Sequence, residues 1–441
     1  MGYRHYVVCG LGFGDEGKGS VTEFLCSPRR PAPARAVVRF NGGAQAAHNV
    51  VTADGRHHAF AQFGSGSFTP GVRTHLSRFM LVDPLALAAE AAHLAAAGVP
   101  GALDRLTVDR DALLTTPYHR AANRARELAR GQDRHGSCGM GIGETARYAL
   151  GHPADAPRAA DCASPRALAR SLGRLRDRLA DEFGVLGGPE VAGLCDAYRA
   201  FAERVPLVDG GYLRRLLRAG PAVFEGAQGV LLDEWRGFHP YTTWSRTTFA
   251  NAETLLAEAG EAGVRLGVVR CYLTRHGPGP LVTEDPTLEV PEPHNRHGTW
   301  QGAFRIGHPD AVALRYAAEA AGGVDAVALT HLDAAARYPL RLCRAYQAGG
   351  RRLARIVPGP ERDLRWQEDL TTMLLRARPV YDDLGAGAGS GPGAGSGPGA
   401  GAGPDWPGIF SEVLSAPIAL RSYGPAAADK REVPAGYLAR A

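Results

Sequence analysis

Short apolar runs alternate with longer Ala- and Leu-rich segments along most of the chain. The runs that favour strands are VVRF, FMLV, AVFEG, LGVVRCYL and DAVALTHL, which begin at residues 37, 79, 222, 266 and 325. Between them, segments such as Pro84–Ala97 and Ser164–Phe183 have the composition and length of helices. This alternation of buried strands and helices predicts an α/β fold with a largely parallel sheet.

One stretch departs from this pattern. Residues 385–404 consist only of Gly, Ala, Ser and Pro, which provide no side chain able to build a core, so they predict a flexible loop on the surface. The whole chain has 441 residues and is 45% hydrophobic, which is enough to bury a large core. We therefore expect residues 1–441 to form a single catalytic domain with one inserted Gly/Ala/Pro/Ser loop.

The most distinctive motif is GFGDEGKGS, residues 12–20, between a predicted strand and a predicted helix. A glycine-rich turn before a helix directs backbone N–H groups at an anion, which is typical of phosphate binding. Its glycines and Lys18 have the spacing of a P-loop, but Gly19 stands where such loops carry a Mg²⁺-binding Ser or Thr. Asp15 lies inside the loop, where phosphates repel a carboxylate unless it binds the metal or acts on a second substrate. For this loop alone, a common Gly-rich turn with solvated charges stays open as the alternative.

Three further polar blocks follow apolar runs. VVRFNGGAQAAHNVV places Gln45, His48 and Asn49 beside a double glycine, and a loop histidine is suited to act as an acid near neutral pH. HGSCGMGIGE, which begins at His135, carries four glycines and favours another anion-binding turn. The block over 222–252 ends a buried strand in FEGAQ and continues with hydroxyl groups beside an arginine, a pattern that suits phosphate. Taken singly, a structural histidine and solvated surface loops remain alternatives for these blocks.

Together and in this order, the blocks resemble the adenylosuccinate synthetase family. Its members carry WGDEGKG, GGHNAGHT, GTTGRGIG, FEGAQGTLLD with a Thr-rich tail, and TRVGSGPFPTE. The corresponding stretches here are FGDEGKG, GGAQAAHN, GSCGMGIG, FEGAQGVLLD followed by YTTWSRTT, and TRHGPGPLVTE, within a region from about Tyr6 to Asp333. The resemblance implies a P-loop-NTPase-like α/β fold, with a mainly parallel central sheet flanked by helices and with helical and small antiparallel additions.

The resemblance also implies a reaction. Members use GTP and Mg²⁺ to phosphorylate the 6-oxygen of a 6-oxopurine nucleotide, and they then join the amino group of L-aspartate to carbon 6. The phosphate is needed because oxygen alone is a poor leaving group. Asp15 would take the proton from N1 of the base and His48 would stabilise charge at the transferring phosphoryl group, while Gln228 would hydrogen-bond near the 6-oxygen.

Further residues are implied as ligands by the same resemblance. Those for the donor nucleotide are Gly14, Glu16, Gly17, Lys18, Gly19, Asn49 and Asp333. Those for the acceptor nucleotide or the amino acid are Gln45, Ser137, Cys138, Thr243, Thr299 and Arg305. Mg²⁺ would be held by Asp15 and by the backbone carbonyl of Ala47. Asp333 lies in THLD, where the family carries TKLD and the carboxylate reads guanine.

The departures from the family pattern concern the choice of substrates. In GTWQGAFRIGHPD, Gly298–Asp310, only Arg305 remains of the arginines in the family's amino-acid loop, and no other side chain replaces the planar guanidinium equally. In the acceptor blocks, Gln45 and Cys138 replace an Asn and a Thr. Several alternatives therefore stay open: dGMP or a nucleoside-antibiotic monophosphate as acceptor, ATP or dATP as donor, a catalytically inactive nucleotide-binding homologue, or a GTPase without the ligase step.

Charge and cysteine content argue against other classes. The net charge of +5 is a mild excess, and without a dense basic stripe we expect no nucleic-acid partner. The seven cysteines show no CxxC spacing, which argues against a zinc site or a disulfide framework and favours the cytoplasm. No apolar run is long enough to cross a bilayer, and no signal-peptide pattern is present, so we expect no membrane association. The resemblance implies a homodimer in which one arginine reaches the neighbour's acceptor phosphate, with Arg147 and Arg158 as candidates.

Deletion of Gly389–Gly401 tests the inserted loop. Because this loop offers no core side chain, we expect turnover within about two-fold of that of the full chain. The measurement compares turnover at saturating substrate and the thermal unfolding midpoint of the two proteins. A collapse of turnover at an unchanged midpoint would assign the loop a part in catalysis.

Overall fold

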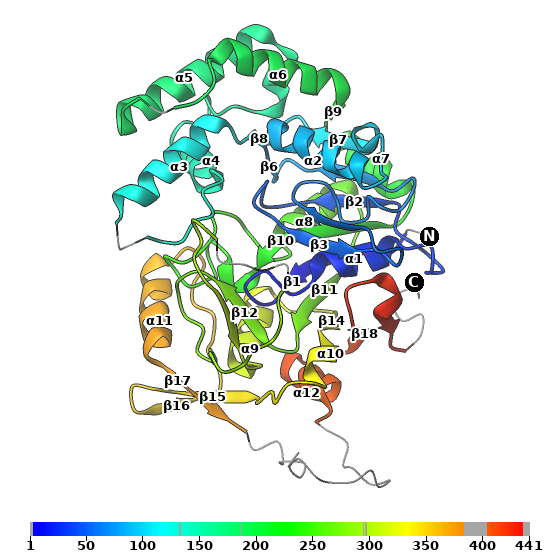
Figure 1. Ribbon diagram of the computed structural model, residues 1–441, viewed down its shortest axis with the longest axis vertical. Helices are drawn as coiled ribbons and strands as arrows, with labels where there is room; N and C mark the ends of the chain where they lie inside the picture. The colour runs from blue at the N-terminus through cyan, green and yellow to red at the C-terminus, as the bar shows by residue number, and fades with distance from the viewer. Residues whose placement is uncertain are drawn as a thin grey trace.

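The structure is a computed structural model that describes residues 3–131, 134–185, 187–293, 295, 298–382 and 404–434. Its centre is a ten-stranded sheet in the order β19-β18-β14-β11-β1-β10-β2-β5-β7-β9 (Figure 1). Every neighbouring pair in this sheet is parallel except β18 and β19. The predicted α/β fold, with a mainly parallel central sheet flanked by helices, is confirmed.

In the described part of the chain, the strands form one large sheet and four small ones. The large sheet contains β1 (His5–Gly10), β2 (Ala36–Arg39), β5 (Arg73–Leu76), β7 (Leu106–Asp109), β9 (Leu207–Val208), β10 (Ala222–Gly229), β11 (Gly263–Arg270), β14 (Ala326–Thr330), β18 (Ile418–Ser422) and β19 (Lys430–Glu432). The small sheets are β3 (His48–Val51) with β4 (His57–Phe60), β6 (Leu81–Val82) with β8 (Leu113–Leu114), β12 (Leu273–His276) with β13 (Phe304–Gly307), and β15 (Cys343–Ala348) with β16 (Arg351–Leu353) and β17 (Arg378–Tyr381). All the small sheets are antiparallel except the one formed by β6 and β8.

Helices occupy both faces of the large sheet and one end of the molecule. They are α1 (Lys18–Cys26), α2 (Pro84–Ala96), α3 (Pro117–Ala129), α4 (Ile142–Gly151), α5 (Pro165–Phe183), α6 (Val191–Arg204), α7 (Gly210–Arg218), α8 (Ala250–Ala259), α9 (Ala311–Ala320), α10 (Leu332–Ala335), α11 (Leu364–Arg376) and α12 (Trp406–Leu414). The two helices expected from composition are α2 and α5. Ser164 is the N-cap of α5, and its side chain accepts a hydrogen bond from the Ala167 N–H, which is why the helix begins at Pro165.

Two predicted strands differ from the structure. In FMLV only Leu81–Val82 is a strand, and it pairs with β8 outside the central sheet. LGVVRCYL contains the end of β11, a bend, and Leu273 at the start of β12. An apolar run shows that a segment is buried, but it does not show where the backbone turns. The predicted inserted loop lies outside the described residues, apart from Pro404.

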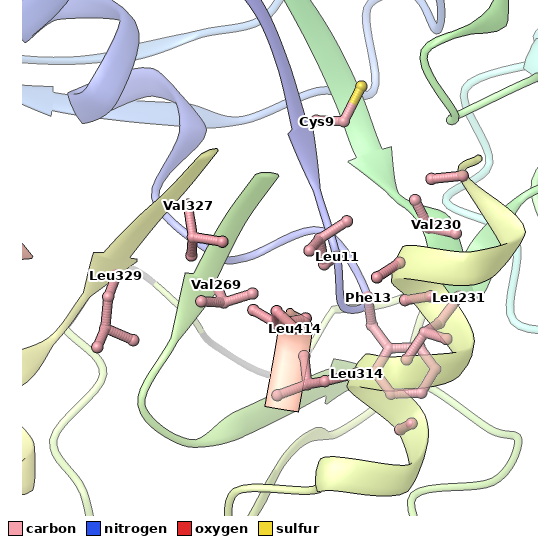
Figure 2. Close-up of a cluster of buried hydrophobic side chains, with 14 of the residues drawn as sticks. Cys9, Leu11, Phe13, Val230, Leu231, Val269, Leu314, Val327, Leu329 and Leu414 are labelled. Carbon is pink, nitrogen blue, oxygen red and sulfur yellow. The ribbon is translucent and has the colours of Figure 1, made fainter. Parts of the chain in front are cut away.

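The central sheet is apolar on both faces because helices cover both. Tyr6 and Val8 of β1 belong to a hydrophobic cluster with α1, whereas Val7 and Cys9 belong to the cluster on the opposite face. This alternation follows from the two-residue period of a strand. Figure 2 shows part of the second cluster, in which Val269 of β11 lies among side chains that include Leu314 of α9 and Leu414 of α12.

A second hydrophobic core lies in the part built from α2 to α6 and extends to β3 and β4 and to β5 and β7 of the central sheet. Leu94 of α2, Tyr118 of α3, Leu172 of α5 and Tyr198 of α6 are among its fully buried side chains. In Figure 1, α5 and α6 lie at the end of the molecule opposite α12. Among the described residues, no helix has the length and apolar character needed to span a membrane.

Substitution of Gly229 tests how closely β10 packs against the loop after β1. A Cβ at this position would lie 2.3 Å from the Gly12 carbonyl oxygen and 2.9 Å from Glu16 Oε1. Because backbone cannot move aside cheaply, we expect Gly229→Ala to lower the free energy of unfolding by about 1–3 kcal/mol. The control is Gly173→Ala in α5, where an added Cβ has no atom within 4 Å and should stabilise by about 0.5–1 kcal/mol. Equal stability of the two variants in denaturant titration would contradict this packing.

Candidate active site

The carboxyl ends of four adjacent strands, β11, β1, β10 and β2, lie at the same edge of the central sheet. Each of these strands is followed by one of the polar motifs. Loops after neighbouring parallel strands converge, and ligands commonly bind where they do. Together with residues 135–147 they enclose a cavity of about 420 Å³, which we call the sheet-edge cavity.

Nine of the predicted site residues line this cavity. They are Gly14, Asp15, Gln45, Ala47, His48, Ser137, Cys138, Gln228 and Thr243. Glu16, Gly17, Lys18 and Gly19 belong to the adjoining loop and to the start of α1, but they are not part of the lining. Segments more than two hundred residues apart in the chain, such as those of Asp15 and Gln228, thus meet in one place.

Four predicted site residues lie away from the cavity lining. Asn49, on β3, has its Oδ1 2.9 Å from His57 Nε2. Asp333 lies on α10, and Thr299 is exposed. The guanidinium of Arg305 makes two bonds to Glu284, at 2.9 and 2.5 Å, and donates to the carbonyls of Gly277 and Gly279. Arg305 therefore has its hydrogen bonds satisfied within the protein in this structure.

The carboxylate of Glu16 fills the inside of the loop between β1 and α1. Its Oε1 accepts from the N–H groups of Gly12 at 3.0 Å and Gly14 at 2.7 Å, and its Oε2 accepts from Lys18 Nζ at 2.9 Å. Lys18 also donates to the Gly14 carbonyl at 2.7 Å. Glu16 and Lys18 are both nearly fully buried, so this ion pair holds the shape of the loop.

The unusual Gly19 has a steric cause. A Cβ at this position would lie 2.8 Å from Cβ of His48 and 3.1 Å from the Ser65 hydroxyl oxygen. No side chain fits there, so the Ser or Thr of an ordinary P-loop is excluded by the approach of β3. The close contact in turn brings His48 against the start of α1.

Asp15 faces the cavity on the other side of the loop. Its Oδ2 lies 3.6 Å from His276 Nε2, and its backbone carbonyl accepts from Arg270 Nη1 at 3.0 Å. Burial raises the pKa of the Asp15 carboxyl, although His276 and Arg270 act in the opposite direction. A carboxylate in such surroundings is a better proton acceptor than an ordinary aspartate, which suits a general base.

His48 is paired with Glu225, a buried glutamate on β10 of the central sheet. Its Nδ1 lies 2.7 Å from Glu225 Oε1, and Glu225 also accepts from the Ser65 N–H at 3.0 Å and the Ser65 hydroxyl at 2.5 Å. Burial lowers the pKa of His48 to about 4, even though Glu225 acts to raise it. Burial alone would raise the pKa of Glu225, but His48 and Arg39 hold it below its usual value. Because ionised Glu225 can only accept, Nδ1 of His48 carries the hydrogen, and Nε2 has no partner among the residues that the structure describes.

Two amide side chains of the cavity lack hydrogen-bond partners. Both amide atoms of Gln45 and Oε1 of Gln228 are buried without a partner among the described residues. Gln228 also has a positive φ of 58°, a conformation that is uncommon outside glycine. Buried polar groups are nearly always satisfied, so orphaned ones in a cavity point to a missing polar ligand.

At the end of the cavity formed by α3 and α4, arginine side chains pair with glutamates. Arg126 donates to Glu144 at 2.5 Å, Arg130 pairs with Glu127, and Arg147 lies beside this group. Ser137 accepts from Asn123 at 2.9 Å in the loop that closes this end. Of the two candidates for the arginine that crosses a dimer, Arg147 lines the cavity and Arg158 does not.

Several lining residues were not predicted from the sequence. They are His276, Arg275, Gln301, Asn295 and Trp244. Glu225 was visible only as the end of a strand, because its partner His48 is 177 positions away. His276 carried a signal: it stands in TRHGPGPLVTE where the family pattern has Val.

The donor set at Asp15 fits Mg²⁺. The described residues contain no group of three or more His, Cys, Asp or Glu side chains able to hold a metal. Protein-bound Mg²⁺, however, usually has one or two carboxylates, with phosphates of the substrate and water completing the octahedron. Asp15 and the backbone of Ala47 both line the cavity and can supply oxygen ligands of this kind.

A model of the adenylosuccinate synthetase family matches residues 7–374. The chain belongs to this family. The adenylosuccinate synthetase of Desulfovibrio desulfuricans is 32% identical over 396 residues, covering 86% of this chain and 87% of that protein. The enzyme of a Marinomonas species is 34% identical over 350 residues, covering 75% and 77%. The chain is accordingly a ligase that forms a C–N bond, in a family of purine biosynthesis whose members bind GTP and generally use Mg²⁺.

Solved structures share the fold. Fully ligated adenylosuccinate synthetase from Plasmodium falciparum aligns with a TM-score of 0.76 at 20% identity, over 97% of this chain and 99% of that one. The succinoaminodeoxyadenylate synthetase of cyanophage S-2L, bound to dGMP and dATP, aligns with a TM-score of 0.58 at 17% identity, over 98% and 96%. At these identities the likeness concerns the architecture.

Glu225→Gln tests the pairing that sets the His48 tautomer. In the free wild-type protein we expect the His48 ¹⁵N shifts to show the Nδ1–H tautomer, constant between about pH 5 and about pH 8. A glutamine can donate as well as accept, so the variant should show both tautomers. Ser65→Ala is the matched control, because it removes one bond to Glu225 and keeps the carboxylate. A mixed tautomer in the wild-type protein would contradict the assignment.

Proposed function

We propose that this protein couples hydrolysis of GTP to the joining of L-aspartate to carbon 6 of a 6-oxopurine nucleotide, through a 6-phosphoryl intermediate. The observation that carries the proposal is the meeting of Asp15, His48 and Gln228 in the sheet-edge cavity. Each is the type of group that one step of the reaction requires. The family membership and the orphaned amides of Gln45 and Gln228 support it further.

In the first step Asp15 takes the proton from N1 of the acceptor base. The electrons of the N1–H bond become available to the 6-oxygen, which attacks the γ-phosphorus of GTP while the bond to GDP breaks. Gln228, with its unpartnered amide oxygen and its amide nitrogen, is placed to hydrogen-bond the base near this oxygen. Mg²⁺ held by Asp15 and Ala47 would neutralise charge on the phosphates.

His48 acts on the transferring phosphoryl group. To donate to a phosphoryl oxygen, Nε2 must carry a proton, so His48 serves in this step as an imidazolium. In the free protein burial keeps it neutral, with a pKa of about 4. The negative charges of Glu225 and of the incoming phosphates both favour the protonated form. Binding of the donor nucleotide therefore favours the protonated form of His48, which then stabilises charge on the transferring phosphoryl group.

In the second step the amino group of aspartate attacks carbon 6. The C–N bond forms, the C–O bond breaks, inorganic phosphate leaves and the nitrogen gives up one proton. We assign the amino acid to the part of the cavity lined by Gln301, with the nearby Thr299 and Arg305 as binding residues by family resemblance. Arg305 must give up bonds to Glu284 to take this part.

The remaining binding assignments also rest on the resemblance. Donor phosphates are assigned to Gly14, Glu16, Gly17, Lys18, Gly19 and Asn49, guanine to Asp333, and the acceptor to Gln45, Ser137, Cys138 and Thr243. We also propose a homodimer with Arg147 at the shared edge. Gln45 and Cys138 depart from the family pattern, which favours an acceptor other than IMP as the second candidate, with dGMP and nucleoside-antibiotic monophosphates as the alternatives.

An acceptor panel tests the proposal. Purified protein with Mg²⁺ and aspartate is incubated with GTP or ATP and with IMP, dGMP, GMP or nucleoside-analogue monophosphates, and the succino-adduct is measured by mass spectrometry. We expect an adduct with at least one acceptor. Asp15→Asn should lower its formation by about 10²–10⁴-fold because it removes the general base. Donor hydrolysis that continues without any adduct would instead indicate a GTPase, and an adduct at wild-type rate from Asp15→Asn would remove Asp15 from the mechanism.

A further inference from the structure

His276, the last residue of β12, lies beside the carboxylate of Asp15. Its Nε2 is 3.6 Å from Asp15 Oδ2, and its side chain lines the sheet-edge cavity. The family pattern quoted for this segment has Val at this position, so a polar ring has been placed next to the proposed base in this chain. No role in the reaction as described so far uses it.

The imidazole of His276 packs against an aromatic ring of the neighbouring strand β13. In the antiparallel pair of β12 and β13, His276 is directly opposite Phe304, and the two ring centroids are 4.7 Å apart with an interplanar angle of 60°. Nδ1 of His276 is buried and has no partner among the described residues. Cross-strand aromatic pairs of this kind restrict the rotamer of each ring. The contact with Phe304 therefore holds Nε2 of His276 on the side of Asp15.

Among the described residues, the cations Arg270 and Lys18 near Asp15 are hydrogen-bonded to atoms other than its carboxylate. Arg270 Nη1 donates to the backbone carbonyl of Asp15, not to its carboxylate. Lys18 Nζ is bonded to Glu16 and to Gly14. His276 is thus the side chain whose position bears directly on how the carboxylate is turned.

We propose that His276 is a positioning residue for the ligase reaction, which holds Oδ2 of Asp15 so that Oδ1 stays directed at the acceptor base. The inference rests on the proposed function. The terminal torsion of an aspartate is broad, so a carboxylate held at one oxygen needs less ordering when the base arrives. A separation of 3.6 Å exceeds a hydrogen bond, and catalytic contacts commonly tighten when substrate binds.

Three variants test the proposal in the acceptor panel. His276→Val restores the family residue and removes the contact, and His276→Gln keeps an N–H donor of similar reach. His93→Gln, at an exposed position of α2, is the matched control for the substitution. For each protein, kcat, the KM of both nucleotides and of aspartate, and the thermal unfolding midpoint are measured.

We expect His276→Val to lower kcat by about 10–100-fold, with each KM within about two-fold of wild type, because the base is present but less well oriented. His276→Gln should recover kcat to within about five-fold of wild type, and the control should match wild type. Unfolding midpoints should agree for all four proteins.

Other outcomes would overturn the assignment. An unchanged kcat in His276→Val, or a change confined to the KM of aspartate, would mean that His276 is part of the cavity wall. Equal loss in the Val and Gln variants would show that no donor to Asp15 is involved. Absence of adduct from the wild-type protein with every acceptor would overturn the proposed function, and this inference with it, whereas a wild-type adduct with an unimpaired Val variant would overturn the inference alone.

Discussion

The carboxylate of Glu16, held inside the loop after β1, is the interaction on which the site depends. A buried charge is tolerated only when it is paired and hydrogen-bonded, and here two backbone N–H groups and Lys18 provide both. The loop must curl tightly to do so: a Cβ at Gly10 would lie 2.0 Å from Glu16 Oε2. Thr330 at the end of β14 fastens the same residue by donating to the Glu16 carbonyl at 2.7 Å. With Glu16 turned inward, its neighbour Asp15 is presented to the cavity.

Asp15 and His48 share one electrostatic setting. For both residues burial is the largest influence on the pKa, raising that of Asp15 and lowering that of His48. Each shift favours the neutral form of the group in the free protein. Phosphates and a purine bring their own charges and hydrogen bonds, which act more strongly on buried groups than they would in water. In the proposed reaction, phosphates and Glu225 would favour the protonated form of His48, whereas His276 and Arg270 favour the ionised form of Asp15 that a base requires.

Much of the fold and of the site could be predicted from the sequence, because short motifs carry both glycine geometry and chemistry. Asp15, His48 and Gln228 lie together because their motifs stand at the carboxyl ends of adjacent parallel strands. The alternation of predicted strands and helices along the sequence already indicated a parallel sheet. Side-chain partnerships could not be predicted in this way. The bonds of Glu225 to His48 and Ser65 cross 177 and 160 positions, and Arg305 is bonded to Glu284 from a neighbouring turn. Such pairings depend on strand order and rotamers, neither of which has a local pattern.

The sheet-edge cavity lies between two hydrophobic cores. Asp15, His48 and Gln228 come from loops and strand ends at the edge of the central sheet, whereas Asn123 and Ile142 come from α3 and α4, which pack with the core of the α2–α6 part. A ligand that spans the cavity contacts both sides, so its binding free energy is added to the free energy that holds the two cores together. Ligand binding then stabilises the contact between the two parts, and a more stable contact in turn strengthens ligand binding. A substitution that loosens the packing of the helical part, such as one at Leu172, would therefore weaken the binding of a ligand that spans the cavity, although Leu172 does not line it.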